Sequence, residues 1–302
     1  MPVVRGRQAD LGDGTLVTRL LPSSLRRTVG PWCFADVFRA TGIGDLPGMH
    51  VAPHPHVGLE TVTYLVEGEV NHRDGLGNDA VVRPGELSLM TAGAGIAHSE
   101  HSPPGHGPVL HGVQLWIALP DELRHATPAY RHARALPSAA VGGLDCRVLL
   151  GSFAGVASPA AGLTPCVAAE LVWPRTAGGS RTAGGSRTPV PLDPSYEHAV
   201  VVLGESVSLD GVEIGPGQLA VLDAGADAVA LDAPPGGRAL LLGGAPFRED
   251  LLMWWNFVAR TAEEIEDARS RWEHGGFDPV SADASPPVPA PPLPAGRLRA
   301  RR

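Results

Sequence analysis

The sequence contains no lysine, so all 24 of its basic side chains are arginines. Enzymes that form a Schiff base need a lysine amine, and that class of chemistry is therefore excluded. Cysteine is also scarce, because Cys33, Cys146 and Cys166 are the three in the chain. Three scattered thiols, an odd number, predict buried free cysteines rather than a disulfide framework.

Long apolar runs and net positive charge are absent as well. No stretch approaches the roughly 20 apolar residues that a membrane-spanning helix needs, and no basic and apolar leader follows Met1. The net charge of −8 gives no general attraction to phosphate backbones or to anionic membranes. We therefore expect a cytoplasmic protein, monomeric, with neither nucleic acid nor a membrane as partner.

The residues that are present indicate an all-β protein. Short runs of β-branched and aromatic residues, such as TVTYLVEGEV at 61–70 and VLHGVQLWIAL at 109–119, are separated by glycine-rich turns. Many short strands at regular spacing are typical of a sandwich or barrel rather than of alternating strands and helices. The hydrophobic fraction of 43% is enough for a sizeable core.

An internal repeat predicts two copies of one β unit. RPGELSLMTAGAG at 83–95 matches GPGQLAVLDAGAD at 215–227, and YLVEGEV at 64–70 matches VVLGESV at 201–207. We expect a first domain over 1–135 and a second over 136–260. The second copy also contains an exact tandem hexapeptide, TAGGSR, at 176–181 and 182–187, which predicts an exposed loop.

Two pairs of possible metal ligands stand in the first copy. His54 and His56 form one pair, and His98 and Glu100 form the other. Residues i and i+2 of a strand share a face, so each pair can present both side chains to one interior. Three imidazoles and one carboxylate suit a divalent transition metal such as iron, manganese, cobalt, nickel, copper or zinc.

The second copy lacks this set. Sliding the ligand positions onto it places Pro191 and Asp193 at the first pair, and Ala230 and Asp232 at the second. The repeat keeps its scaffold residues without these histidines, so the fold itself does not require them. This contrast within one chain favours a metal site over a chance cluster of histidines.

Other polar residues near these pairs have simpler interpretations. His101 follows Glu100 and would point to the opposite face of a continuing strand. His72 lies in NHRDGLGND, where Arg73 and Asp74 suggest a turn and a structural role. Glu60 could orient a ligand from the same face as His56.

The C-terminal region differs from the rest. TAEEIEDARSRWEHGGF has a capping Thr261, Glu264 three residues later and apolar residues at helical spacing, which predicts a helix over 261–275. Residues 281–302 are rich in proline and alanine and end in RLRARR, a composition that predicts a disordered tail.

Several of these motifs occur together, in order, in one known family. The chain resembles the pirin family in HPH followed by GLETVTYLVEGEVNHRDGLGN, in PGELSLMTAGAGIAHSE, in YEHAVVVL and in WWNFVARTAEEIEDARSRW. The resemblance implies two tandem cupin barrels of antiparallel strands and one metal, usually Fe(II), in the N-terminal barrel. The family's ligands correspond to His54, His56, His98 and Glu100.

The resemblance implies two alternative functions. Some bacterial members resemble quercetin 2,3-dioxygenases, which open a flavonol ring with dioxygen and release carbon monoxide. In that case a small phenolic substrate binds at the metal, and Glu100 accepts the proton of its hydroxyl group. The alternative is a non-enzymatic, redox-sensitive iron protein that binds a transcription factor or a metabolic enzyme.

Overall fold

The computed structural model describes residues 1–302 except 12–14, 42, 44–47, 176–186, 297 and 302. The chain forms two compact units. The first unit contains residues 9–17, 38–134 and 248–302, and the second unit contains residues 1–8, 18–37 and 135–247. The TAGGSR duplication lies outside the described residues except for its last residue, Arg187.

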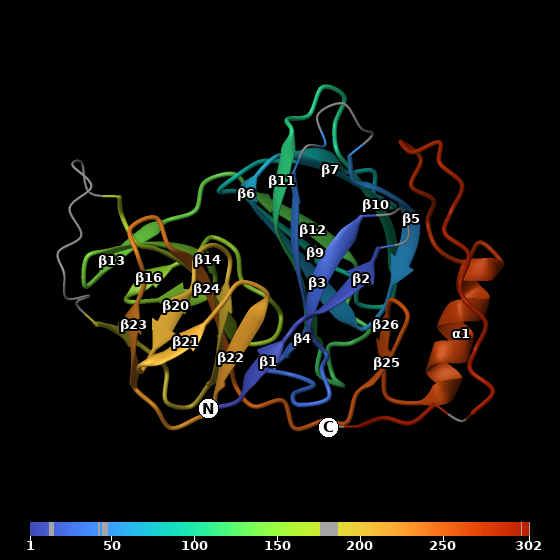
Figure 1. Cartoon of the computed structure of the whole chain (residues 1–302). Coiled ribbons are helices and arrows are strands. Elements are labelled where there is room, and N and C mark those ends of the chain that lie inside the picture. The colour runs from blue at the N-terminus through green and yellow to red at the C-terminus, as the bar shows by residue number, and fades with distance from the viewer. Residues whose placement is uncertain (12–14, 42, 44–47, 176–186, 297, 302) are drawn as a thin grey trace. The chain divides into compact units, whose positions relative to one another are not determined.

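Nearly every element of the described chain is a β-strand (Figure 1). The first unit contains β5 (His50–His56), β6 (Leu59–Glu67), β7 (Val70–Asp74), β8 (Asp79–Val82), β9 (Leu87–Thr91), β10 (Ile96–His101), β11 (Val109–Ala118), β12 (Ala129–Ala133), β25 (Leu252–Trp254), β26 (Phe257–Ala259) and the helix α1 (Ala262–Glu273). The second unit contains β1 (Val3–Arg5), β13 (Ser138–Val141), β14 (Leu144–Leu150), β15 (Ser152–Phe153), β16 (Val156–Ala157), β17 (Cys166–Val172), β18 (Thr188–Pro191), β19 (Glu197–Val202), β20 (Val207–Leu209), β21 (Val212–Ile214), β22 (Gln218–Leu222), β23 (Ala228–Asp232) and β24 (Arg238–Gly244). Strands β2 (Arg7–Asp10), β3 (Leu16–Leu21) and β4 (Trp32–Thr41) contribute residues to both units.

The two units share one strand order, which confirms the predicted repeat. The first unit has a four-stranded sheet in the order β5-β10-β7-β8, and the second unit has β18-β23-β20-β21. The larger sheets contain β9-β6-β11 in the first unit and β22-β19-β24 in the second. The paired strands of these sheets run antiparallel, as the resemblance to cupin barrels implied.

The register of these sheets corrects the sequence comparison by one residue. In the first unit His54 pairs with His98, and in the second unit Val190 pairs with Val229. A shift of one residue moves a side chain to the other face of a strand. The inward counterparts of the four predicted ligands are therefore Val190, Leu192, Val229 and Leu231, and not Pro191, Asp193, Ala230 and Asp232.

The corrected counterparts form part of the hydrophobic core of the second unit. Val190, Leu192, Val229 and Leu231 all belong to one buried apolar cluster. The pairing of Leu209 with Leu231 supports the assignment, because His72 and Glu100 pair in the same way in the first unit. The second unit thus has packed apolar side chains where the first unit has imidazoles and a carboxylate.

Helix α1 confirms the predicted C-terminal helix. The hydroxyl of Thr261 accepts a hydrogen bond from the Glu264 backbone N–H, and the Glu264 carboxylate accepts one from the Thr261 backbone, so the capping box is complete. Ile265 and Ala268 are buried and pack with residues of β25 and β26. No helix in the described part of the chain is long and apolar enough to cross a membrane.

The C-terminal segment differs from the disorder that its composition predicts. The Val288 backbone N–H donates to the Pro53 carbonyl of β5 at 2.8 Å, and the Trp272 indole N–H donates to the Val288 carbonyl at 2.8 Å. Near the end of the chain, Leu251 and Arg301 exchange two backbone hydrogen bonds. These bonds give a proline-rich segment the partners that its own side chains cannot supply.

Candidate metal centre

Strands β5 and β10 place the predicted histidines on one inner face. His54 pairs with His98, and His56 pairs with Ile96, so alternate residues of both strands point inward. Pro53 and Pro55 occupy the intervening positions of β5. Because β5 is the edge strand of its sheet, prolines without an N–H are tolerated there.

Gly58 makes the corner that turns β5 into β6. Its φ is +72°, and a Cβ at this position would lie 2.0 Å from the carbonyl oxygen of Val258. A side chain here would therefore displace either the corner or the strand beside it. The glycine fixes how closely β5 approaches β26.

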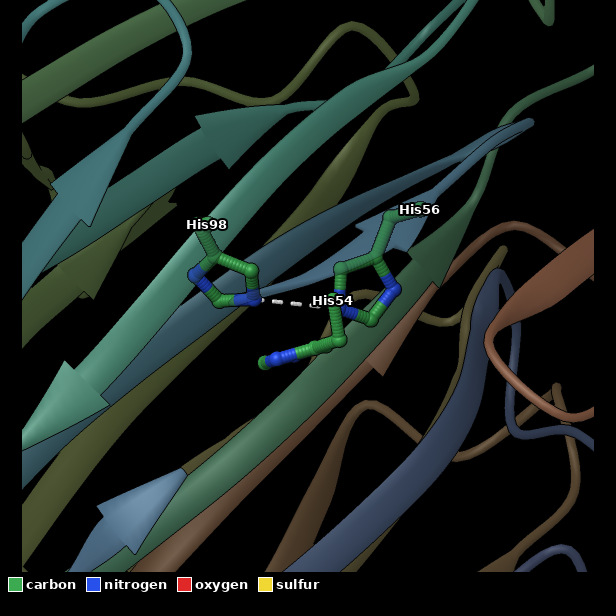
Figure 2. Close-up of side chains that lie close together, drawn as sticks. All are labelled: His54, His56 and His98. Atoms are coloured by element: carbon green, nitrogen blue, oxygen red, sulfur yellow. Dashed lines mark hydrogen bonds between the residues drawn. The ribbon is translucent and has the colours of Figure 1, made fainter. Parts of the chain in front are cut away.

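The rings of His54, His56 and His98 gather in one place (Figure 2). The ring centroids are 5.0 Å apart for His54 and His56, and 4.4 Å apart for His54 and His98. The Nε2 atoms of His56 and His98 are 3.1 Å apart. The structure thus brings together three of the four predicted ligands in a group that could hold a metal ion.

Each of these rings has a partner that fixes its tautomer. The Nδ1 atom of His54 lies 2.9 Å from the carbonyl oxygen of Ala52, and that of His56 lies 3.1 Å from the carbonyl oxygen of Asn256. A carbonyl only accepts, so both Nδ1 atoms must donate. Their Nε2 atoms therefore carry lone pairs, as metal ligands require.

The Nδ1 atom of His98 has His72 as its partner. The Nδ1 atoms of His72 and His98 are 3.4 Å apart, and the Nε2 of His72 lies 3.2 Å from Asp74 Oδ2. If His72 donates to the carboxylate, its Nδ1 can accept the Nδ1 proton of His98. His98 then has its Nε2 lone pair free for a cation, like His54 and His56.

Burial keeps these imidazoles neutral. Loss of hydration lowers the pKa of His54 to about 4, with a smaller opposing effect of the Ala52 carbonyl. The same cause lowers the pKa of His56 and of His98 well below the ordinary value. Neutral rings are the form in which histidine binds a metal.

Glu100 follows His98 after an irregularity in the β5–β10 pairing. It pairs with His72 of β7 and joins His72 and His98 in a second group of possible metal ligands. Burial raises its pKa, while His72 and the hydroxyl of Thr63 lower it less. Glu100 is buried in the same interior as the three histidines, but its oxygen is grouped with His72 rather than with His54 and His56.

Thr63 links Glu100 to a second polar side chain. Its hydroxyl lies 3.0 Å from Glu100 Oε1 and 2.7 Å from Gln114 Oε1. A hydroxyl has one proton and can donate to only one of these oxygens. The amide of Gln114 resolves this if it turns its nitrogen toward Thr63, because Thr63 then accepts from Gln114 and donates to Glu100.

His72 is the residue for which the sequence favoured a structural role. Asp74 does hold a turn, since its carboxylate accepts from the Leu76 and Asn78 backbones. His72 itself lies in the site, where its ring stacks on Tyr130 at 4.3 Å and 7°. The spacing of His72 and Asp74, two residues apart on one strand face, was a signal for this.

The other residues considered lie outside both groups. Glu60 is buried and accepts a hydrogen bond from Thr91 at 2.8 Å. His101 pairs with Asp283 of the C-terminal segment. Trp116, which sequence analysis did not single out, contacts the site: its ring lies 5.1 Å from that of His56 in an edge-on arrangement.

Comparison with known proteins decides the family. The model described as Pirin matches residues 14–117, and the model described as Pirin C-terminal cupin domain matches residues 180–278. The chain belongs to the pirin family. This pirin therefore has two cupin domains, as the resemblance implied.

Similar proteins extend over nearly the whole of this pirin. A Pseudomonas aeruginosa protein, provisionally named a quercetin 2,3-dioxygenase, is 40% identical over 96% of this chain and 90% of its own length. The crystal structure of a quercetin 2,3-dioxygenase from Acinetobacter baumannii has a TM-score of 0.92 at 35% identity and covers 100% of this chain and 98% of that one. A bacterial pirin from Escherichia coli in complex with nickel(II) shares the fold, with a TM-score of 0.61 at 21% identity, covering 82% of this chain and 99% of that one.

Proposed function

We propose that this pirin is a metal-dependent dioxygenase that acts on a flavonol such as quercetin. One divalent metal, iron(II), is held by His54, His56 and His98, with Glu100 as the fourth ligand and as the catalytic proton acceptor. The similarity to proteins named as quercetin 2,3-dioxygenases supports the substrate class. The buried imidazole cluster supports the metal.

One observation carries the metal proposal. The Nε2 atoms of His56 and His98 face each other at 3.1 Å, and when both rings donate through Nδ1, to the Asn256 carbonyl and to His72, neither Nε2 carries a proton. Two lone pairs at this distance repel each other. A cation held by both nitrogens would replace this repulsion with attraction, so the residues fit a metal ion.

The donor set fits several ions. Three neutral nitrogens and a carboxylate suit iron, manganese, cobalt, nickel, copper and zinc, and metal supply selects among them. The nickel(II) complex of the E. coli pirin agrees with this breadth. Four protein donors on a metal that prefers six would leave positions open for other molecules.

The bound metal would supply a Lewis acid for a substrate hydroxyl and a redox-capable centre for dioxygen. The protein's own residues handle the proton. Glu100 accepts it from the substrate hydroxyl, and the raised pKa of the buried carboxyl favours holding it. Thr63 holds the Glu100 carboxylate in place at 3.0 Å.

The proposed overall reaction balances without another reactant. One dioxygen enters the flavonol, the central ring opens and one carbon leaves as carbon monoxide. Both atoms of dioxygen enter the ring-opened product, and the carbon monoxide takes its carbon and its oxygen from the flavonol. No external reductant or oxidant beyond dioxygen is consumed.

The test is turnover by protein loaded with one metal at a time. Chelator-treated protein receives ferrous iron, manganese, cobalt, nickel or copper, and loss of flavonol absorbance is followed together with carbon monoxide release. We expect turnover with at least one metal and none with His98→Ala. The matched control is His106→Ala, because His106 lies outside both groups of possible ligands.

Absence of turnover with every metal would reject the enzyme and favour the regulatory alternative. In that case the metal content should still fall in His98→Ala. A partner protein whose affinity differs between ferrous and ferric protein would then be the expected finding.

A further inference from the structure

The second unit has a cavity of about 640 Å³ beside its hydrophobic core. Leu192, Leu241 and Val167 are among its apolar lining residues, and Phe153 lies beside them. Leu192 is the inward counterpart of His56 by the register described above. One of the four inward counterparts of the predicted ligands therefore lines a cavity, while the other three, Val190, Val229 and Leu231, pack in the core of the second unit.

One buried histidine reaches this cavity. His198 lines it and is 2% exposed. Its ring donates one N–H to the backbone of Tyr196, which leaves the second ring nitrogen of a neutral imidazole with its lone pair. Burial lowers its pKa, so the ring is neutral and that nitrogen is a hydrogen-bond acceptor.

His198 is not a remnant of the metal site. It belongs to β19, whereas the first unit's histidine ligands come from β5 and β10. Its counterpart in the first unit is Thr61, because Tyr64 pairs with Leu87 as Val201 pairs with Leu219. A hydroxyl in one unit corresponds to an imidazole in the other.

A second difference between the units provides space for the His198 imidazole. Thr61 pairs with Trp116, and His198 pairs with Gly243 at the matching position. A Cβ at Gly243 would lie 2.6 Å from Cδ2 and 3.0 Å from Nε2 of His198. The absence of a side chain at Gly243 thus leaves space for the His198 ring at the position where the first unit has an indole.

A negative charge at the rim of the cavity disfavours anionic ligands. Asp193 is exposed and lines the cavity, and its carboxylate accepts from the Ser195 backbone at 2.9 Å and the Ser195 hydroxyl at 2.6 Å. These bonds lower the pKa of Asp193, so the rim is negative and repels anions. A neutral molecule is favoured over a carboxylate.

We infer that the second unit binds a neutral aromatic alcohol, a phenol or naphthol, whose ring fills the apolar cavity and whose hydroxyl donates to His198. Apolar side chains beside the buried imidazole acceptor of His198 fit a planar molecule with a single donor. This site is separate from the metal ligands and does not depend on the proposed dioxygenase activity.

The test is a fluorescence titration of the full-length, metal-free protein with 2-naphthol. Its methyl ether, 2-methoxynaphthalene, has no donor, and 2-naphthoate tests the charged rim. We expect 2-naphthol to bind about tenfold more tightly than the ether, as one net hydrogen bond allows. The carboxylate should bind more weakly than the ether.

Variants assign the effect to this cavity. His198→Phe fills the same volume and should reduce the ratio of the two dissociation constants to about one, while Leu192→Trp should weaken both ligands. His106→Ala should leave the ratio at about ten, and near-ultraviolet circular dichroism checks that each variant is folded. Equal binding of naphthol and ether in the unmodified protein, or an unchanged ratio in His198→Phe, would overturn the inference.

Discussion

His72 and His98 face each other through their Nδ1 atoms, 3.4 Å apart, on neighbouring strands. The contact makes His72 a positioning residue. When the Nδ1 of His72 accepts the Nδ1 proton of His98, the hydrogen bond fixes the orientation and the tautomer of the His98 ring. Asp74 fixes His72 in turn, at 3.2 Å. The arrangement is a carboxylate, two imidazoles and then the proposed metal.

Replacing His72 should therefore weaken the metal site without abolishing it. Phenylalanine keeps the stack on Tyr130 but cannot accept the proton of His98. We expect His72→Phe to reduce metal affinity about 10- to 100-fold, the range for partners of metal-bound histidines. Calorimetric titration of chelator-treated protein with nickel(II) measures this. His54→Ala should lose far more, and equal losses in the two variants would assign His72 a ligand role instead.

Glu100 should matter more for turnover than for folding. Glu100→Gln keeps the shape of the side chain but cannot accept a proton, so the rate with quercetin should fall about 10²- to 10⁴-fold. Metal content measured on the same sample separates a lost proton acceptor from a lost ligand. Thr63→Ser, which retains the hydroxyl that holds Glu100, is the matched control and should keep most of the rate.

Acid should destabilise the metal-free protein over a defined range. The pKa of His54 is about 4 in the folded protein, against an ordinary value of 6.5, so the unfolded chain takes up the proton first as the pH falls. Stability is unaffected by His54 above this range and is lost between pH 6.5 and about 4, by about 3 kcal/mol at the acid end. His56 and His98 act in the same direction.

Glu100 opposes this trend, because its raised pKa lets the folded protein take up a proton first. The three histidines lower the free energy of unfolding at acid pH more than the one carboxyl raises it, so the metal-free protein should become less stable. Urea unfolding at several pH values measures it, and His54→Gln should show a shallower dependence on pH. An equal slope in the two proteins would mean that His54 is protonated equally easily in the folded and the unfolded chain.

The cap of α1 gives a prediction about stability alone. Thr261→Ala removes the hydroxyl that accepts from the Glu264 backbone at 3.2 Å and should cost about 1 kcal/mol. Thr261→Ser keeps the acceptor and should cost little. Thermal unfolding compares the two variants. Identical midpoints would show that Glu264 alone holds the start of the helix.

Local patterns predicted most of the fold and three of the gathered side chains. The spacing of His54 and His56 was informative because alternation along a strand is a property of the strand itself. The helix was visible for the same reason, since Thr261 and Glu264 are three residues apart in the sequence. Such signals need no knowledge of which strands are neighbours.

Relationships between strands could not be predicted in this way. The contact of His72 with His98 joins positions 26 residues apart, and it depends on β7 pairing with β10. The one-residue error in the second copy has the same origin, because sliding one sequence over another cannot see cross-strand register. The contacts of the C-terminal segment could not be predicted either, because partners such as Pro53 lie far away in the chain.

The matching strand orders of the two units have a practical consequence for every experiment on this molecule. Both barrels have one topology and belong to one polypeptide, so they are present at the same concentration in every sample. A histidine-modifying reagent, a hydrogen-exchange label or acid therefore acts on both under identical conditions. A change in labelling confined to peptides of β5 and β10 indicates an effect of the proposed metal. A change that peptides of β18 and β23 also show indicates an effect on the barrel structure that both units share. The chain contains its own reference sample, and ratios between the two halves cancel errors of protein amount, purity and dose.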